Sequence, residues 1–411
     1  MGNRRKFVKQ IGAAVVGTQL IPALPSSSHT TNKNWLSIKN SYLNTSHPIL
    51  NMNTGSAGIM PSPVLNALQA YQKELHGYAP YAVKDQNQKL QAQVMAKLAA
   101  LTATSENNLA IVRNTTEAIN LVLHGVTWRS GDEILYSDVD YPYVVNTIHQ
   151  LAQKYGVVPI KVPLDLAVMS DQEIVDSYAS HMSKASRLAV FTYITHREGR
   201  RLPAQKLCQL ANAQGVEALV DGAHTVGQLA VDLDALGCDY FASSLHKWLS
   251  APLGVGLLYV HPDKADALAP DISYPMGKQR GMTKFLYLGT TAFEKIKGLD
   301  AALDFQMAVG EERKYERLLT LARYLHERLD AMEEIEFIVP MVSSSILSYR
   351  MLGIKSNPLS RAYLERGIHV KLSGYPKLPS HLRVSVNLHT MESDLDRFVN
   401  VTKEIAQQIR K

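Results

Sequence analysis

The sequence predicts an α/β fold, in which a mainly parallel sheet of seven strands is covered by helices on both faces and is joined to a smaller α+β domain. Between residues 109 and 260, short apolar runs alternate with stretches of helical periodicity, as in repeated βαβ units. After residue 291 the pattern changes to a long helical stretch followed by strand-like runs. With 411 residues, of which 46% are hydrophobic and 19% charged, the chain is long and apolar enough for two domains.

The N-terminal segment has the pattern of an export signal. A basic start with Arg4 and Arg5 precedes an apolar run over residues 11–24 and a Pro-Ser exit. The run is too short to span a bilayer, and the paired arginines followed by Phe7 resemble a twin-arginine signal, which exports folded proteins. We expect a periplasmic protein that uses the twin-arginine translocation machinery and has no membrane span. The alternative is a basic N-terminal helix that frays.

The chain is expected to divide into four parts: the signal at residues 1–28, a connector or arm at 29–60, a large domain at 61–300 and a small domain at 301–411. Residues 30–47 look like a polar connector, and residues 49–58 like a short extended piece that turns into a Gly/Ser loop. Two helices follow, the first opened by Pro61-Ser62-Pro63 and the second over residues 84–100.

Strands and helices then alternate. The seven strand candidates are residues 109–113, 133–137, 157–162, 188–194, 218–221, 240–243 and 255–260. Helical patterns between them include residues 116–124, 144–155, 171–182 and 204–212. The small domain is predicted from helical residues 292–329, strand-like runs at 337–339, 345–350 and 383–388, and a closing helix at 391–409.

Composition excludes several classes of protein. The net charge of +6 is small and scattered, and no basic stripe is interleaved with aromatic residues, so we expect no nucleic-acid partner. Cys208 and Cys238 are too few for a disulfide scaffold or a cysteine metal site. Both lie in apolar surroundings and are interpreted as buried thiols.

Residues 217–259 hold the candidate chemistry. An apolar run ends at Asp221, and Lys247 follows another strand candidate twenty-six residues later. Open α/β sheets present ligand-binding groups in this way at the carboxyl ends of their strands. An acid facing a partly neutral lysine fits pyridoxal phosphate, with Lys247 as Schiff-base amine and Asp221 on the pyridinium nitrogen. Taken singly, Lys247 is more simply a surface lysine and Asp221 a turn former.

Two further groups fit this hypothesis. The stretch Asn114-Thr115-Thr116 joins a strand to a helix, and such a helix start can bind a phosphate, although an ordinary N-cap is the simpler interpretation. Ser244 and His246 precede the lysine closely enough to add donors. Arg383, in a strand of the small domain, could clamp a substrate carboxylate, with a surface ion pair as the alternative.

Together these stretches resemble the class V aminotransferases of the fold-type I pyridoxal-phosphate enzymes, which include cysteine desulfurases and isopenicillin N epimerase. The resemblance runs from about residue 51 to residue 401 and rests on DGAH at 221–224, SSLHKW at 243–248 and NTTEAIN at 114–120. It implies roles for the following residues: Lys247 as Schiff-base lysine, Asp221 as pyridinium partner, His224 on the cofactor O3′, Tyr141 stacked on the ring, Thr115, Thr116, Ser244 and His246 on the phosphate, and Arg383 on the substrate carboxylate.

The resemblance also implies a homodimer with shared active sites, because Gly289-Thr290 matches the turn that reaches the neighbouring subunit's phosphate. Two stretches depart from the family pattern. Residues 367–379, which match the loop that holds the nucleophilic cysteine of the desulfurases, contain no cysteine. Residues 195–199, Thr-His-Arg-Glu-Gly, replace the usual Ser-Asn or Ser-Pro before a glycine. His196 could be a passive loop residue, and no role is assigned to it.

We therefore expect an aminotransferase or epimerase that acts on the α-carbon of an amino acid or peptide-like metabolite. An exported lyase or a peptide-siderophore tailoring enzyme is an alternative implied by the family. A non-catalytic sensor that binds the cofactor would not need Arg383 together with Lys247 and Asp221. A nucleotide-binding oxidoreductase is disfavoured, because Gly254-Val255-Gly256 leads into a strand rather than a helix.

Overall fold

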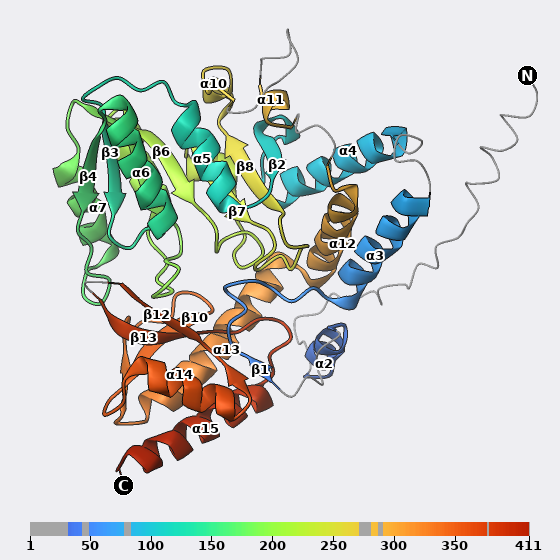
Figure 1. Ribbon diagram of the computed structural model, residues 1–411, viewed down its shortest axis with the longest axis vertical. Helices are drawn as coiled ribbons and strands as arrows, with labels where there is room; N and C mark the ends of the chain where they lie inside the picture. The colour runs from blue at the N-terminus through green and yellow to red at the C-terminus, as the bar shows by residue number, and fades with distance from the viewer. Residues whose placement is uncertain are drawn as a thin grey trace, which may run out of the picture.

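A computed structural model describes residues 32–42, 49–77, 84–270, 281–286, 291–375 and 378–410. The predicted export signal and the predicted phosphate-binding Thr290 lie outside these residues. The described chain forms a large α/β part with a smaller α+β part beneath the sheet in the view of Figure 1. None of the helices within the described ranges has the length and apolar character needed to cross a membrane.

The central sheet has seven strands in the order β2-β8-β7-β6-β5-β3-β4. All neighbours are parallel except β8, which runs antiparallel to both β2 and β7. This confirms the predicted fold class, with strand ends shifted by at most two residues. The strands are β2 (Leu109–Val112), β3 (Glu133–Ser137), β4 (Val158–Val162), β5 (Ser186–Thr192), β6 (Glu217–Asp221), β7 (Tyr240–Ser244) and β8 (Gly256–Val260).

Helices cover both faces of the sheet because side chains alternate along each strand. In β5, Val190 packs on one face with α5 and α6, whereas Phe191 packs on the other face with α7 and α8. Helices α3, α4 and α12 extend the second layer. The helices of the large part are α3 (Ser62–Gly77), α4 (Lys84–Leu101), α5 (Thr115–Gly125), α6 (Pro142–Tyr155), α7 (Asp171–His181), α8 (Ala204–Ala213), α9 (Leu233–Leu236), α10 (Pro262–Ala265), α11 (Thr283–Leu286) and α12 (Phe293–Val309), with a 3₁₀ turn η2 (Glu106–Asn108).

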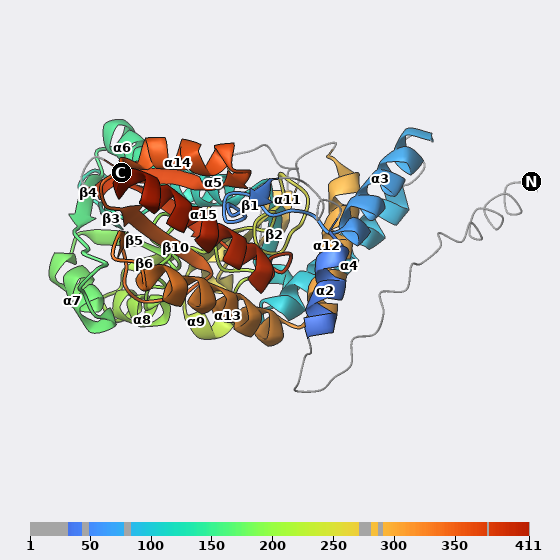
Figure 2. The same ribbon diagram turned by 90° about the horizontal axis from the view of Figure 1, so that it is seen from below.

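The small α+β part is built on a four-stranded antiparallel sheet of order β12-β13-β10-β9. Figure 2 views the molecule from below, on the side of the small domain, and shows α15 running across this sheet. Its elements are α13 (Glu311–Asp330), β9 (Ile335–Phe337), β10 (Ile346–Met351), α14 (Ser356–Glu365), β11 (Ile368–His369), β12 (Lys371–Tyr375), β13 (Leu378–Ser385) and α15 (Glu392–Arg410). The sequence did not predict α14 or β12, and it placed the strand around Arg383 too late: the strand begins five residues before Arg383 and ends at Ser385.

The predicted polar connector is wrong for residues 32–40, which form helix α2 (Asn32–Asn40). Trp35 and Ile38 are buried against Phe305 and Val309 of α12, so two apolar residues anchor an otherwise polar helix. Further on, β1 (Leu50–Asn51) pairs in parallel with β11, which attaches the arm to the small domain.

The two cysteines are buried and free, as predicted. Cys208 lies in α8, and burial raises the pKa of its thiol to about 12. Cys238 lies just before β7, at the end of that strand opposite to Lys247, and burial raises the pKa of its thiol well above its ordinary value. Both thiols are therefore unreactive core groups.

Candidate active site

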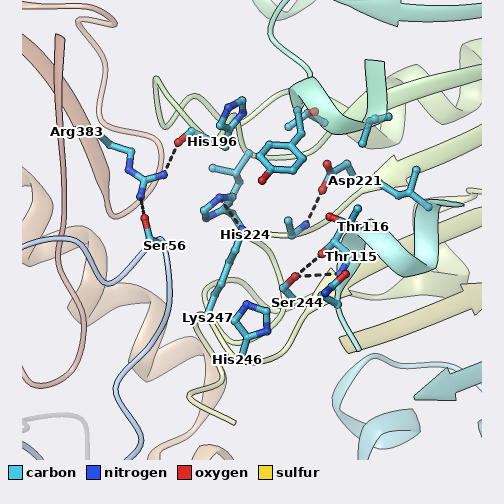
Figure 3. Close-up of a pocket in the computed structure, with 18 of the residues that line it drawn as sticks. Ser56, Thr115, Thr116, His196, Asp221, His224, Ser244, His246, Lys247 and Arg383 are labelled. Carbon is cyan, nitrogen blue, oxygen red and sulfur yellow. Dashed lines mark hydrogen bonds between the residues drawn. The ribbon is translucent and has the colours of Figure 1, made fainter. Parts of the chain in front are cut away.

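A cavity of about 360 Å³ opens at the carboxyl ends of β5, β6 and β7, between the large sheet and the small domain (Figure 3). This is where an open parallel sheet places its ligand-binding groups. The residues that line it are Gly55, Ser56, Asn114, Thr115, Thr116, Ile119, Tyr141, Val144, Thr192, Ile194, His196, Asp221, Ala223, His224, Ser244, His246, Lys247, Lys371 and Arg383.

One end of the cavity is formed by the start of α5. Asn114 caps this helix, with its side-chain oxygen accepting from Glu117 N at 2.9 Å. Ser244, at the end of β7, accepts from Thr115 N at 3.1 Å and shares a 2.7 Å hydrogen bond with Thr115 Oγ1. The exposed amides and hydroxyls of a helix start favour a phosphate. The N-cap interpretation and the anion-binding interpretation are thus compatible, because Asn114 caps the helix while Thr115 and Thr116 line the cavity.

Asp221 ends β6 and is buried, with its Oδ1 accepting from Ala223 N at 2.9 Å. Burial raises the pKa of its carboxyl, while the Ala223 amide and the charge of Lys247 oppose that rise. Beside it, buried Asp140 accepts from Ser137 N and Thr192 Oγ1, both at 2.6 Å, and burial raises its pKa to about 7. Asp221 therefore lacks a cationic hydrogen-bond partner within the described residues, and a protonated ring nitrogen would supply one.

Lys247 follows β7 and is half-buried at the cavity wall. Burial lowers the pKa of its ammonium to about 8; Asp221 opposes this effect and Arg383 adds to it. About a tenth of the amine is then neutral at pH 7, far more than for an exposed lysine. Its Nζ lies 3.2 Å from His224 Nε2. A surface lysine is thus excluded, and the geometry suits a nucleophilic amine.

The neighbouring Trp248 sets the protonation state of His224. The indole Nε1–H donates to His224 Nδ1 at 3.1 Å, and an indole nitrogen can only donate. Nδ1 is therefore unprotonated, and the ring's one proton lies on Nε2, facing Lys247. Burial, together with the charges of Lys247 and Arg383, lowers the pKa of His224 well below 6.5, so the ring stays neutral. Nε2–H can donate to a phenolic oxygen, which is the role that the resemblance implies for His224.

The loop with Lys247 is held from two sides. Buried Lys314 of α13 donates to Trp248 O at 2.6 Å and to Gln306 Oε1 at 2.9 Å. From the N-terminal arm, Gly58 N donates to His246 O at 2.8 Å. A side chain at Gly58 would place its Cβ 2.0 Å from Lys247 O, so only glycine allows this approach. These contacts fix the direction of the lysine side chain.

Arg383, in the interior of β13, lies at the other end of the cavity. It donates to His196 O at 2.6 Å, Asn53 Oδ1 at 2.8 Å and Ser56 Oγ at 2.7 Å, while its buried Nε has no hydrogen-bond partner. Burial lowers the pKa of its guanidinium to about 10, and the charge of Glu198 opposes this. The surface ion pair considered from the sequence is wrong, since Arg383 is only 4% exposed and donates to three uncharged groups.

Tyr141 and His196 lie together in the lining of the cavity. Tyr141 precedes α6, and its ring lies edge-on to the His196 imidazole with centroids 5.2 Å apart. His196 Nδ1 is buried without a hydrogen-bond partner, and burial with nearby Arg197 lowers the pKa of the ring well below 6.5. His196 is thus a cavity residue, which the sequence alone did not establish.

The structure brings all the predicted site residues within the described ranges to one cavity: Lys247, Asp221, Arg383, His224, Thr115, Thr116, Tyr141, Ser244 and His246. Sequence reasoning missed Asn53, Ser56, Lys371 and the role of Trp248. The Gly/Ser loop at residues 49–58 was the sequence feature that could have indicated Asn53 and Ser56. Nothing in the sequence marks Lys371, because it lies on a strand that was not predicted.

This donor set fits pyridoxal phosphate. A helix start with hydroxyls suits the phosphate, buried Asp221 lacks a cationic partner, and a lysine of lowered pKa lines the same cavity. The fold and site thus define a pyridoxal-phosphate enzyme of fold type I.

Comparison with known proteins identifies the family. The model of "Aminotransferase class-V" matches residues 49–398, and the chain belongs to that family. The isopenicillin N epimerase of Amycolatopsis lactamdurans is 29% identical over 382 residues, covering 87% of this chain and 96% of the relative. A cysteine desulfurase of Escherichia coli O6:K15:H31 is 26% identical over 392 residues, covering 87% and 93%.

Solved structures agree in fold. The cystine C-S lyase C-DES in complex with cysteine persulfide superposes with a TM-score of 0.79 at 25% identity, covering 86% of this chain and 96% of that one. A C-DES variant with glycine covalently linked to the pyridoxal-phosphate cofactor gives a TM-score of 0.82 at 23% identity, covering 88% and 98%. The family and the donor set of the cavity together make pyridoxal phosphate the cofactor of this protein.

Proposed function

We propose that this protein is an aminotransferase or epimerase that moves a proton at the α-carbon of an amino acid or peptide-like metabolite. The observation that supports this most directly is the position of Lys247, whose half-buried amine of lowered pKa lies between Asp221 at one end and Arg383 at the other. The epimerase relative, aligned over nearly its whole length, favours the same class of substrate.

Each residue has a defined task in this proposal. When bound through Lys247 Nζ, pyridoxal phosphate supplies an electron sink that stabilises a carbanion. Asp221 keeps the ring nitrogen protonated, and the start of α5 with Ser244 holds the phosphate. Arg383 orients the substrate carboxylate. Lys247, once released by the substrate amine, takes the α-proton as a general base.

The destination of this proton would decide between two outcomes. Its return to the opposite face of the α-carbon would give epimerisation, whereas its transfer by Lys247 away from the α-carbon would give transamination. Loss of a β or γ group instead would give elimination. Desulfuration through a protein persulfide is disfavoured. Residues 367–379 contain no cysteine, and Cys208 and Cys238 are buried in the core away from the cavity.

The test is a product-resolved panel. Purified holoprotein is incubated with amino acids and small peptides in deuterated water, with and without a keto acid. Deuterium at the α-carbon with inversion supports epimerisation, and conversion of the keto acid supports transamination. A yellow protein that binds its cofactor but exchanges no α-proton on any amine would contradict the proposal and favour the sensor alternative.

We further propose that the protein acts as a homodimer with shared sites and is exported by a twin-arginine signal. Export of a folded chain suits an enzyme that acquires its cofactor in the cytoplasm. Sedimentation tests the first part, and a dimer is expected. Cell fractionation of the wild type and of Arg5→Lys tests the second: the wild type should reach the periplasm, and the variant should stay in the cytoplasm.

A further inference from the structure

The end of the cavity that receives the substrate holds one more cation than an α-carboxylate requires. Lys371 and Arg383 are directly opposite each other on the antiparallel strands β12 and β13, so their side chains leave the same face of the sheet. Both line the cavity that holds Lys247. Like charges directly opposite each other destabilise a sheet. This pair therefore points to an anion that binds between or beside them.

A comparison of the charged groups in the cavity with the anions they would bind leaves Lys371 as the cation without an anionic partner. Asp221 is the only carboxylate among the described residues that line it, and it faces the ring nitrogen end. The phosphate has the start of α5, and one α-carboxylate is matched by the guanidinium of Arg383. The side chain of Lys371, by contrast, is exposed and makes no hydrogen bond or ion pair within the part of the chain that the structure describes.

A second polar group at the same end also lacks a partner. His196 Nδ1 is buried without a hydrogen bond, and the carbonyl of the same residue accepts from Arg383. A buried polar atom without a partner is unfavourable, and a ligand atom can supply the missing hydrogen bond. The neutral ring can carry its proton on Nδ1 and donate it to an anionic oxygen.

We propose that the substrate is an amino acid with a second carboxylate, which binds to Lys371 and His196 while Arg383 holds the α-carboxylate. This inference rests on the proposed function, because it takes the α-carbon to lie above Lys247. Arg383 is almost fully buried and Lys371 is exposed, so the second carboxylate lies toward the cavity mouth. Lys371 thus selects the substrate without taking part in the proton transfer.

The test uses holoprotein and two carboxylic acids that have no amine, glutarate and butyrate. Their dissociation constants are measured from the change in the absorbance of the bound cofactor. A charge-assisted contact is expected to make glutarate bind about 10-fold more tightly than butyrate. Lys371→Gln should abolish this preference and leave butyrate unchanged, whereas Lys371→Arg should retain it. Lys403→Gln, on an exposed part of α15, is the matched control and should behave as the wild type.

Two results would overturn the inference. One is equal binding of glutarate and butyrate by the wild type. The other is an equal loss of both ligands in Lys371→Gln, which would mean that Lys371 and Arg383 share one carboxylate. Failure of the proposed function looks different: borohydride would then fail to fix the cofactor to Lys247, or no amine in the panel would exchange its α-proton. In that case the proposed function and the second-carboxylate site at Lys371 would both be rejected.

Discussion

The two ends of the cavity differ in how completely their polar groups are satisfied. At the phosphate end, Asn114 caps α5, and Thr115 and Ser244 bind each other. At the substrate end, His196 Nδ1 and Arg383 Nε are buried without hydrogen-bond partners.

This difference matches what each end has to bind. A cofactor stays in place through many turnovers, so its phosphate site can be rigid and complete. A substrate comes and goes, and each unsatisfied buried group at its end costs about 1–3 kcal/mol that a bound ligand can recover. Substitutions at the two ends should therefore separate cofactor binding from substrate binding.

The largest effect is expected at Lys247, which lies between the two ends. Lys247→Ala removes both the covalent link and the general base, and general-base catalysis alone is worth about 10²–10⁴-fold. We expect activity to fall at least about 1000-fold and borohydride to fix no cofactor. Retained activity with a fixed cofactor would show that another amine does this work.

Arg383→Gln should act at the substrate end only. Truncating a buried charged partner of a ligand costs about 2–5 kcal/mol, so we expect KM to rise at least about 30-fold. The cofactor should bind nearly as tightly as in the wild type, and its absorbance measures this. A loss of cofactor without a change in KM would remove the distinction between the two ends.

Capture of the cofactor by the apoprotein should follow the pKa of Lys247. The neutral amine is the reactive form, and its pKa is lowered to about 8. We therefore expect the capture rate to rise about tenfold per pH unit below 8 and to level above it. Stopped-flow absorbance measures the rate. A rate still rising steeply at pH 9.5 would show that the amine keeps the pKa of an exposed lysine.

A matched pair of serine substitutions sharpens the comparison. Ser244→Ala removes the partner of Thr115 and should weaken cofactor binding about 10-fold, with little change in KM. Ser56→Ala removes a partner of Arg383 and should raise KM about 3-fold without weakening the cofactor. Equilibrium dialysis measures the dissociation constant of the cofactor for each variant, and steady-state kinetics measures the KM of each. The same change in both variants would contradict separate roles.

A similarly small effect is expected from Trp248→Phe. It leaves His224 Nδ1 without its donor, so the proton is no longer restricted to Nε2. We expect activity to fall about 3–10-fold and its pH profile to shift, because losing one neutral hydrogen bond costs about 1 kcal/mol. A fall in activity with an unchanged pH profile would indicate that Trp248 only fills space.

Much of the fold and site could be predicted because the signals are local. Strand β6 contains the apolar run Ala-Leu-Val directly before Asp221, and the start of α5 is marked by Asn114 and two threonines. The helix α2 could not be predicted, because only Trp35 and Ile38 anchor it, and their partners lie on α12. Lys371 was missed for a similar reason, since its strand is defined by pairing with β13 rather than by its own sequence.

The contacts between the N-terminal arm and β13 have a consequence for how the protein matures. The cavity wall joins residues near the start of the chain to Arg383 and Ser385 near its end, separated by about 330 positions. Such distant partners meet late, because a ribosome releases the N-terminal arm long before the last strand exists. We expect the newly made protein to gain its yellow colour only after the whole chain has been synthesised, so a shortened chain ending before β13 should stay colourless.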